Sequence, residues 1–466
     1  DTYVPCTVRY FNSVIDETHA NVGIRPRGNT ARDHKKFPWK LSFNTFVPGR
    51  QFHGVEKLNV NSVAVDPSIS RDSLTFQVHR AAGVPAPRTA HVWLKINDGS
   101  KVLGTYDACE QVDEEFVQAW YGNKTGDLYK CRNLSGKADL KWRSPGTPAT
   151  YAGFPDFEEE ISGSFVELAD FIDFVNHSDN ATFAAGIGAR LNVDLFLRAM
   201  AVDMVTGQWD GYWIGANNYY LYHDPATGLL EYVPWDLDHS LGMDYYLFPI
   251  YGVQGTDFAR RDFFGWGRDG YGGEKGKLGP ILMQRFLREP RFVEVLARYA
   301  REFSARLASP SRLHPRCDEL AGMLAPYAFQ GSFSGANLQF GYEAQDFAES
   351  WTLPADYVAL NVPNTWGVKS FLSVRHQYIA NQYPVPPPLP PASVNEAMAD
   401  NVAALADEAG DFDDWLELHN ASDQPFDVGG MWLSDHPGRP RGWQLPAGTT
   451  IPARGFLLVW CDDEPW

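Results

Sequence analysis

The most informative pattern of apolar and polar positions lies between residues 192 and 241. After Asn192, apolar side chains recur at helical spacing at Val193, Phe196, Leu197, Met200 and Met204. This spacing predicts a helix, and Gly207 marks its end. Strong β-formers at 217–222 and 229–233 predict two strands, and the turn between them starts with Asp-Pro and ends with Gly. We therefore expect a helix, a loop and a β-hairpin in succession.

Turn-forming residues and changes in the pattern divide residues 1–382 into two segments. Residues 1–107 are strand-rich, with one helix that begins near Asp66 and a strand pair on either side of the turn at 97–99. Residues 108–382 are mostly helical around the central hairpin. Further helices are expected at 280–307 and 366–382. The Gly- and aromatic-rich stretch at 251–277 reads either as a mobile loop on the acceptor side or as an ordered surface loop.

Composition then changes sharply at residues 383–392, which are mostly proline. Such a segment is typical of a stiff, extended spacer, and a ligand for an aromatic-lined groove is the alternative. In residues 393–466, short alternating runs and frequent turns predict a small β-sandwich.

Candidate chemistry gathers at the open end of the hairpin. The hairpin folds Asn217 back beside Asp236, and Asp210 lies in the loop before the first strand. We therefore expect Asp210, Asn217 or Asn218, Asp236 and Asp238 to form a cluster. Carboxylates and an amide at one point suit a hard cation such as Mg²⁺, which prefers oxygen ligands.

The same order of groups occurs in protein kinases, where a catalytic-loop Asp precedes a metal-binding Asn, and a hairpin leads to a second metal-binding Asp. The runs Trp209-Asp210, NNYYLY at 217–222 and PWDLDHS at 234–240 resemble the CotH (spore coat protein H) family of atypical protein kinases. The chain lacks the His-Arg-Asp and Asp-Phe-Gly motifs of ordinary kinases. The resemblance implies an α+β, two-lobe kinase-like fold, with residues 1–107 as the N-lobe-like region and 108–382 as the C-lobe-like region.

This resemblance implies roles for the clustered residues. Asp210 would orient the acceptor hydroxyl and accept its proton. Asn217 or Asn218, with Asp236, would hold Mg²⁺, with Mn²⁺ as the alternative ion. Asp238 would bind a second metal or cap a backbone turn.

The amino-terminal third resembles the same family at Arg27-Gly28-Asn29-Thr30 and in the Lys-rich strand after it. Lys36 and Lys40 are expected on one face of that strand, because side chains alternate with a period of two. One of the two lysines would neutralise the phosphate charge of ATP, and Arg27 would belong to a turn that lets the backbone approach a phosphate. Glu110 falls in the expected hinge beside adenine, with a helix cap or a surface acid as the alternative. Lys130 lies near the cleft without an assigned role.

The carboxy-terminal segment resembles a lamin-tail domain, which is a β-sandwich of immunoglobulin type. The runs that carry this resemblance are DWLELHN at 414–420, GGMWLSD at 429–435 and GFLLVW at 455–460. Few residues follow the last run, so we expect an incomplete domain. The architecture implies a secreted protein or one at the cell or spore surface.

The composition restricts the classes of partner that the protein is expected to bind. The net charge of −18 argues against nucleic acid as a partner, whereas a nucleotide needs only a local cation and a metal. An acidic kinase would favour basic protein acceptors. No run of 18 apolar residues occurs, so no transmembrane helix is expected. The five cysteines contain no CxxC pair, which excludes a zinc ribbon.

The sequence is compatible with three functions. The first is an ATP- and Mg²⁺-dependent protein kinase acting on Ser, Thr or Tyr. The second is a catalytically inactive, kinase-like protein that binds surfaces or mediates adhesion. The third is a glycosidase that uses Asp210 with Asp236 or Asp238, which would leave Asn217 and the lysines without a role.

Overall fold

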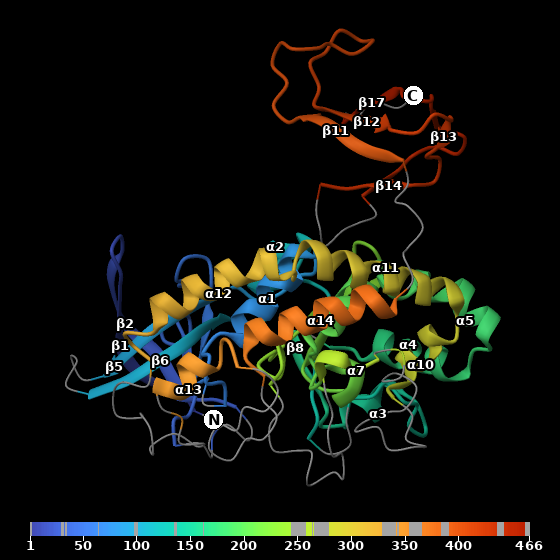
Figure 1. Cartoon of the computed structure of the whole chain (residues 1–466). Coiled ribbons are helices and arrows are strands. Elements are labelled where there is room, and N and C mark those ends of the chain that lie inside the picture. The colour runs from blue at the N-terminus through green and yellow to red at the C-terminus, as the bar shows by residue number, and fades with distance from the viewer. Residues whose placement is uncertain are drawn as a thin grey trace. The chain divides into compact units, whose positions relative to one another are not determined.

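The computed structural model describes residues 2–28, 32, 35–63, 65–96, 101–134, 138–161, 163–243, 258–262, 264, 279–328, 342, 344–353, 366–383, 391–435 and 442–461. The fold is of mixed α+β type (Figure 1). The chain divides into two compact units, Asp1–Pro384 and Val385–Trp466. The boundary falls in the proline-rich segment, most of which lies outside the described residues, as does most of the stretch 251–277.

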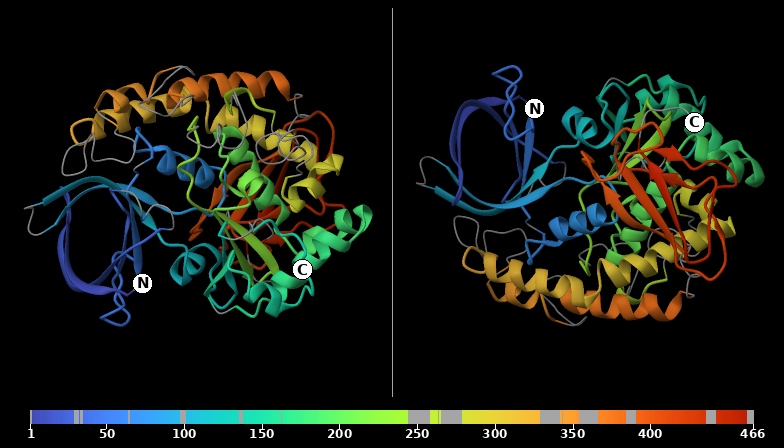
Figure 2. Two further views of the ribbon diagram at one scale, coloured as in Figure 1. Left: turned by 90° about the horizontal axis from the view of Figure 1, so that it is seen from below. Right: turned by 90° about the horizontal axis from the view of Figure 1, so that it is seen from above.

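The first unit begins with a six-stranded antiparallel sheet that curls strongly, as the blue strands in Figure 2 show. The strand order is β1-β2-β3-β4-β6-β5. Its members are β1 (Val4–Phe11), β2 (Asp16–Pro26), β3 (Trp39–Ser42), β4 (Lys57–Asn61), β5 (Thr89–Ile96) and β6 (Lys101–Glu110). The expected strand pair on either side of the 97–99 turn is confirmed by β5 and β6, and the turn itself lies outside the described residues. The segment boundary expected at residue 107 falls within β6.

The expected single strand carrying both Lys36 and Lys40 is wrong. Strand β3 begins at Trp39, and the residues just before it form a bend rather than a strand. The reason is the short pairing with β2, in which Pro26 opposite Trp39 is the last registered pair. Lys40 therefore lies on the strand and Lys36 lies outside it.

The helix expected near Asp66 is α1 (Arg71–Ala81), and it lies between the curved sheet and the helical part of the unit (Figures 1 and 2). The central hairpin is confirmed as β9 (Tyr219–Asp224) and β10 (Leu229–Pro234), paired from Tyr219↔Pro234 to Asp224↔Leu229. With β7 (Leu128–Cys131) and β8 (Phe157–Ile161), these strands form a second sheet in the order β10-β9-β7-β8.

Helices make up most of the rest of the first unit. They are α2 (Glu114–Tyr121), α3 (Pro148–Ala152), α4 (Val166–His177), α5 (Asn180–Gly186), η2 (Ile187–Ala189), α6 (Val193–Thr206), α7 (Tyr212–Gly215), η3 (Phe258–Arg260), α10 (Ile281–Leu287), α11 (Pro290–Arg306), α12 (Pro310–Leu324), α13 (Ala344–Glu349) and α14 (Val368–Gln382). The helix predicted at 280–307 is two helices, α10 and α11. Pro290 explains the break, because proline disfavours a helical residue before it and suits a first helical turn.

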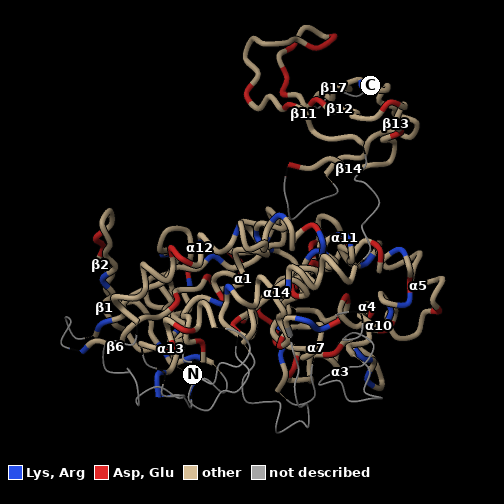
Figure 3. Tube along the Cα trace, viewed as in Figure 1, with Lys and Arg blue, Asp and Glu red and all other residues tan. Residues whose placement is uncertain are grey.

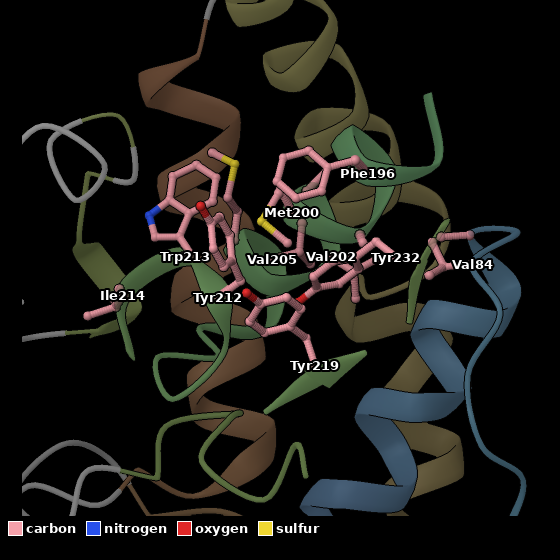
Figure 4. Close-up of a cluster of buried hydrophobic side chains, with 14 of the residues drawn as sticks. Val84, Phe196, Met200, Val202, Val205, Tyr212, Trp213, Ile214, Tyr219 and Tyr232 are labelled. Atoms are coloured by element: carbon pink, nitrogen blue, oxygen red, sulfur yellow. The ribbon is translucent and has the colours of Figure 1, made fainter. Parts of the chain in front are cut away.

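The large core of the first unit centres on α6 and the hairpin. Figure 4 shows Phe196, Met200, Val202 and Val205 of α6 packed with Tyr212, Trp213, Tyr219 and Tyr232. The Tyr219 ring lies 5.1 Å from that of Tyr212 and 5.5 Å from that of Tyr232. Aromatic packing thus anchors both ends of the loop that contains Asp210.

The second unit contains a three-stranded antiparallel sheet of β11 (Ala392–Met398), β12 (Trp415–Asn420) and β17 (Phe456–Trp460). Two short pairs accompany it, β13 (Phe426–Asp427) with β16 (Thr450–Ile451) and β14 (Trp432–Leu433) with β15 (Trp443–Gln444). Its small core comprises Leu418, Val428, Leu445, Ile451 and Val459. These short pairings do not establish the immunoglobulin-like sandwich or the lamin-tail resemblance, and both stay predictions.

Charge is distributed unevenly between the units. Residues 385–466 contain 14 Asp and Glu but only 3 Lys and Arg. Figure 3 shows both signs interspersed through the described part of the first unit and mostly acidic residues in the second. The net charge of the chain therefore gives little information about the candidate site, which lies in the first unit.

None of the helices that the structure describes combines the length and the apolar character that a bilayer span requires.

Candidate active site

Helix α6 delivers the loop that contains Asp210. The helix ends at Gly207, whose φ of 67° lies in the left-handed region that glycine tolerates best. A Cβ at this position would lie 2.7 Å from Cζ of Phe371, so the close approach also requires glycine. The backbone N–H of Trp209 then donates to the His239 carbonyl at 3.3 Å, and its indole N–H donates to the Met243 carbonyl at 2.8 Å. These bonds tie the loop to the segment that follows the hairpin.

The two asparagines at the start of the hairpin meet Asp210. Nδ2 of Asn218 donates to Asp210 Oδ2 at 3.0 Å, and Nδ2 of Asn217 lies 3.4 Å from each carboxylate oxygen. Burial raises the pKa of Asp210, whereas nearby His239 opposes the rise. The expected approach of Asp210 to Asn217 and Asn218 is thus present in the structure.

The other end of the hairpin brings Asp236 beside Asn218. The N–H of Trp235 donates to the Asn218 carbonyl at 3.1 Å. Both Asn218 and Asp236 adopt left-handed backbone conformations, with φ of 55° and 54°, which Asn and Asp accept more readily than most residues. Desolvation, followed by repulsion from Asp238, raises the pKa of Asp236 to about 6. Among the described residues, no three His, Cys, Asp or Glu side chains form a ready metal site.

Two residues without an assigned role in the sequence complete this cluster. Nδ1 of His239 lies 2.9 Å from Asp238 Oδ1 and 3.6 Å from Asp210 Oδ2. The buried Gln208 side chain donates to the Asp236 carbonyl at 3.2 Å and accepts the N–H of Asp210 at 3.2 Å. Their positions within two residues of Asp210 and Asp238 in the chain were the available signal, but which atoms they bridge depends on the folded loop.

The two candidate lysines have different surroundings. Lys36 is buried, donates to the Thr105 carbonyl and lies 4.5 Å from the Tyr106 ring. Desolvation lowers its pKa to about 7, although Asp107 opposes the change. Desolvation also lowers the pKa of Lys40 to about 7, with Glu160 opposing this shift. Lys36 therefore binds strand β6, whereas Lys40 lies among other charged groups.

Those groups form a basic cluster of Arg27, Lys40 and Lys130. The guanidinium of Arg27 lies 5.6 Å from the Trp235 ring and donates to the Asn61 side chain. Nζ of Lys130 lies 6.0 Å from the Trp235 ring. Desolvation lowers the pKa of Lys130, and Glu160 opposes this shift as it does for Lys40. Arg27 also opposes the rise in the pKa of Asp236, so the basic cluster adjoins the carboxylates.

Glu110 occupies neither a helix cap nor the surface. Its buried carboxylate forms an ion pair with Arg88, with Nη2 at 2.7 Å from Oε1 and Nε at 3.1 Å from Oε2. The Glu110 N–H donates to the Arg88 carbonyl at 2.9 Å. The side chain thus fixes the end of β6 to the segment that leads into β5.

Comparison with known proteins finds similarity over most of the first unit. A sequence profile described as CotH kinase protein matches residues 24–358, which include all the site residues discussed above. Inner spore coat protein H of Bacillus subtilis (strain 168) is 28% identical over 233 residues, covering 49% of this chain and 61% of that protein. Invasin CotH2 of Rhizopus delemar is 26% identical over 249 residues, covering 51% and 40%. The chain therefore spans about half the length of these relatives.

One solved structure is more distant. The Shewanella oneidensis MR-1 toxin–antitoxin complex of HipA, HipB and operator DNA overlaps with a TM-score of 0.32 and 13% identity, covering 81% of this chain and 64% of that chain. So low a score supports no conclusion about fold or function.

The geometry at Gly207 predicts a stability effect. Gly207→Ala combines a strained backbone with a clash against Phe371, whereas Gly228→Ala has a similar φ of 69° and nothing within 4 Å. We expect Gly228→Ala to lower the free energy of unfolding by about 1 kcal/mol, and Gly207→Ala to lower it by a further ~1–3 kcal/mol. Urea denaturation of both variants measures the difference. Equal losses would show that Phe371 moves aside without cost.

Proposed function

Because this chain belongs to the CotH kinase protein family, we propose that it is an ATP- and Mg²⁺-dependent kinase that phosphorylates Ser, Thr or Tyr residues of proteins. The observation that carries this proposal is the meeting of Asp210, Asn218 and Asp236. Asn218 donates its amide to Asp210, and its carbonyl accepts the N–H of the residue before Asp236. In this proposal the curved sheet is the N-lobe, and the helices with the hairpin form the C-lobe.

The side chains available near Asp236 fit a magnesium ion. Mg²⁺ is usually held by one or two carboxylates together with substrate phosphates, and Asp236 and Asp238 supply two carboxylates. Oδ1 of Asn217 accepts the N–H of Asn133 at 2.8 Å. We therefore assign the amide ligand to Asn218 rather than Asn217. Mn²⁺ accepts the same oxygen ligands.

When bound, Mg²⁺-ATP would supply the phosphoryl group and offset the charge that develops on it. Asp210 would orient the acceptor hydroxyl and take up its proton. The burial that raises the pKa of Asp210 makes its carboxylate a stronger base than an exposed one. Asn217 and Asn218 would hold that carboxylate in one orientation.

The basic cluster provides the phosphate contacts in this proposal. Lys40 takes the role that sequence reasoning divided between Lys36 and Lys40, because Lys36 already donates to the Thr105 carbonyl. Arg27 and Lys130 would add positive charge beside Trp235. Since the Glu110 carboxylate is engaged by Arg88, adenine would contact the backbone that follows Glu110 rather than its side chain.

Location and partners follow from the relatives in this proposal. The relatives carry the names inner spore coat protein and invasin, which support a position at a spore or cell surface. Secretion and a basic protein acceptor complete the proposal. The invasin names also favour a second candidate, a kinase-like surface-binding protein without catalysis. Transfer of labelled phosphate from ATP to a basic Ser-rich peptide separates the two candidates.

The metal assignment predicts a change in thermal stability. Mg²⁺-ATP should raise the melting temperature of the wild type, because a ligand that binds only the native state stabilises it. Asp236→Asn should remove most of the Mg²⁺-dependent part of the increase. Differential scanning fluorimetry with and without Mg²⁺ measures this. Asp173→Asn, an exposed change on α4, is the control. A full increase in Asp236→Asn would place the metal elsewhere.

The base assignment predicts a change in rate. Asp210→Asn keeps the size of the side chain but removes its charge, so phosphoryl transfer should fall on the order of 10²–10⁴-fold. Nucleotide affinity should hardly change, because Asp210 faces the acceptor. Single-turnover assays with labelled ATP measure the rate. Full activity in this variant would make Asp210 structural, with Asp238 as the next candidate base.

The phosphate assignment predicts opposite outcomes for the two lysines. Lys40→Met should lower kcat/KM for ATP by about 10²-fold, because one preorganised cationic contact is lost. Lys36→Met should change kcat/KM little and alter the melting temperature instead, since Lys36 binds β6. Steady-state kinetics and melting curves measure both effects. The reverse pattern would return the phosphate role to Lys36.

A further inference from the structure

Helix α1 carries three buried polar side chains on one face. Asp72, Thr75 and His79 are three and four residues apart, a spacing that aligns them along the helix. They are 4%, 0% and 0% exposed. Burial of polar groups is costly unless each finds a partner, so their partners indicate what the face does. We call these three residues the α1 stripe.

The first two members hold the backbone of Leu237, the residue between Asp236 and Asp238. The Leu237 N–H donates to Asp72 Oδ1 at 2.8 Å. The Leu237 carbonyl accepts the Ser240 hydroxyl at 2.7 Å, and the Ser240 and Thr75 hydroxyl oxygens are 2.6 Å apart. Since the single Ser240 proton goes to Leu237, Thr75 must donate to Ser240. Helix α1 thus holds the Leu237 N–H directly through Asp72 and the Leu237 carbonyl indirectly through Thr75 and Ser240.

The third member reaches the other half of the site. Nε2 of His79 lies 3.3 Å from Oδ1 of Asp203 on α6, and both side chains are buried. The Asp203 carbonyl accepts the N–H of Gln208 at 3.0 Å, directly before the Trp209-Asp210 pair. Oδ2 of Asp203 would lie 3.4 Å from a Cβ at Gly211. His79 therefore contacts the end of α6 beneath the Asp210 loop.

Apolar contacts hold α1, and with it the α1 stripe, in place. Phe76 lies on the same face and belongs to a core cluster that includes Trp235 and Leu237. Leu74 and Val78 lie on the opposite face and belong to the larger core that contains α6. These contacts seat α1 against both cores, so the stripe has little freedom to shift.

We propose that Asp72, Thr75 and His79 are positioning residues that set the Asp236–Asp238 loop relative to the Asp210 loop. The proposal rests on the proposed kinase function for its catalytic consequence. The three side chains act through backbone groups and through Ser240 and Asp203, and they do not contact the reacting atoms. A shift of α1 would move both loops together, because one rigid helix contacts both.

Thr75 offers the sharpest test. Thr75→Val keeps the shape and removes the hydroxyl, whereas Thr75→Ser keeps the hydroxyl. Supporting groups around metal ligands are typically worth 10–100-fold in metal affinity or activity. We therefore expect Thr75→Val to raise the Mg²⁺ concentration for half-maximal phosphate transfer about 10-fold, and Thr75→Ser to stay near wild type. Thr182→Val, which loses a hydroxyl bond at the start of α5, is the control.

A second measurement does not depend on catalysis. Hydrogen–deuterium exchange of a peptide covering 236–241 should be faster in Thr75→Val than in Thr75→Ser or the wild type, because Leu237 loses its indirect anchor. Ser240→Ala should reproduce this faster exchange, and the double variant should add little, since both changes break one chain of bonds.

The outcomes separate the two proposals. If the wild type neither transfers phosphate nor gains stability from Mg²⁺-ATP, the proposed function fails, and exchange alone decides the positioning role. If Thr75→Val matches Thr75→Ser in both exchange and Mg²⁺ dependence, the positioning role is overturned even in an active kinase. A variant of Thr75 that fails to fold leaves Ser240→Ala to make the same decision.

Discussion

Burial and mutual repulsion of Asp210, Asp236 and Asp238 are the constraint that the surrounding structure has to satisfy. Loss of solvent is the main cause that raises the pKa of Asp210 and of Asp236, and Asp238 raises both further. Ionised carboxylates persist in such a place only when donors or cations compensate them. The compensation comes from two asparagine amides on Asp210, from His239 between Asp210 and Asp238, and from Arg27 near Asp236. A divalent cation would balance the negative charge of the carboxylates that remains uncompensated.

The same constraint explains why the site lies between two cores. Each carboxylate belongs to a loop whose neighbours are anchored by aromatic packing, with Tyr212 and Tyr219 on one side and Trp235 on the other. Packed cores resist small displacements, so loops held between them keep charged groups at fixed separations. The α1 stripe adds hydrogen bonds to the Leu237 N–H and to Ser240, and His79 contacts Asp203 at 3.3 Å. The clustered carboxylates thus lower the stability of the fold, and packing and hydrogen bonds on several sides hold them in place.

The uneven charge of the two units reconciles the net negative charge of the chain with the proposed binding of a nucleotide. A chain with a net charge of −18 is a poor match for a polyanion, but most of that excess lies in residues 385–466. The first unit contains both signs. Arg27 and Lys130 lie beside the Trp235 ring, and both interact electrostatically with Lys40. Local potential, rather than net charge, decides whether a nucleotide can bind.

The sequence by itself determined the features that depend on neighbours in the chain. Helix α6, the β9–β10 hairpin and the approach of Asp210, Asn218 and Asp236 were predictable, because helical periodicity and hairpin register are local properties. Only the tertiary structure decided that Lys40 rather than Lys36 joins Arg27 and Lys130, and that Glu110 pairs with Arg88. It also decided that α1 holds Leu237, and that His239 and Gln208 join separate loops. These contacts join segments far apart in the chain or depend on the path of a folded loop, and neither composition nor spacing encodes which atoms meet there.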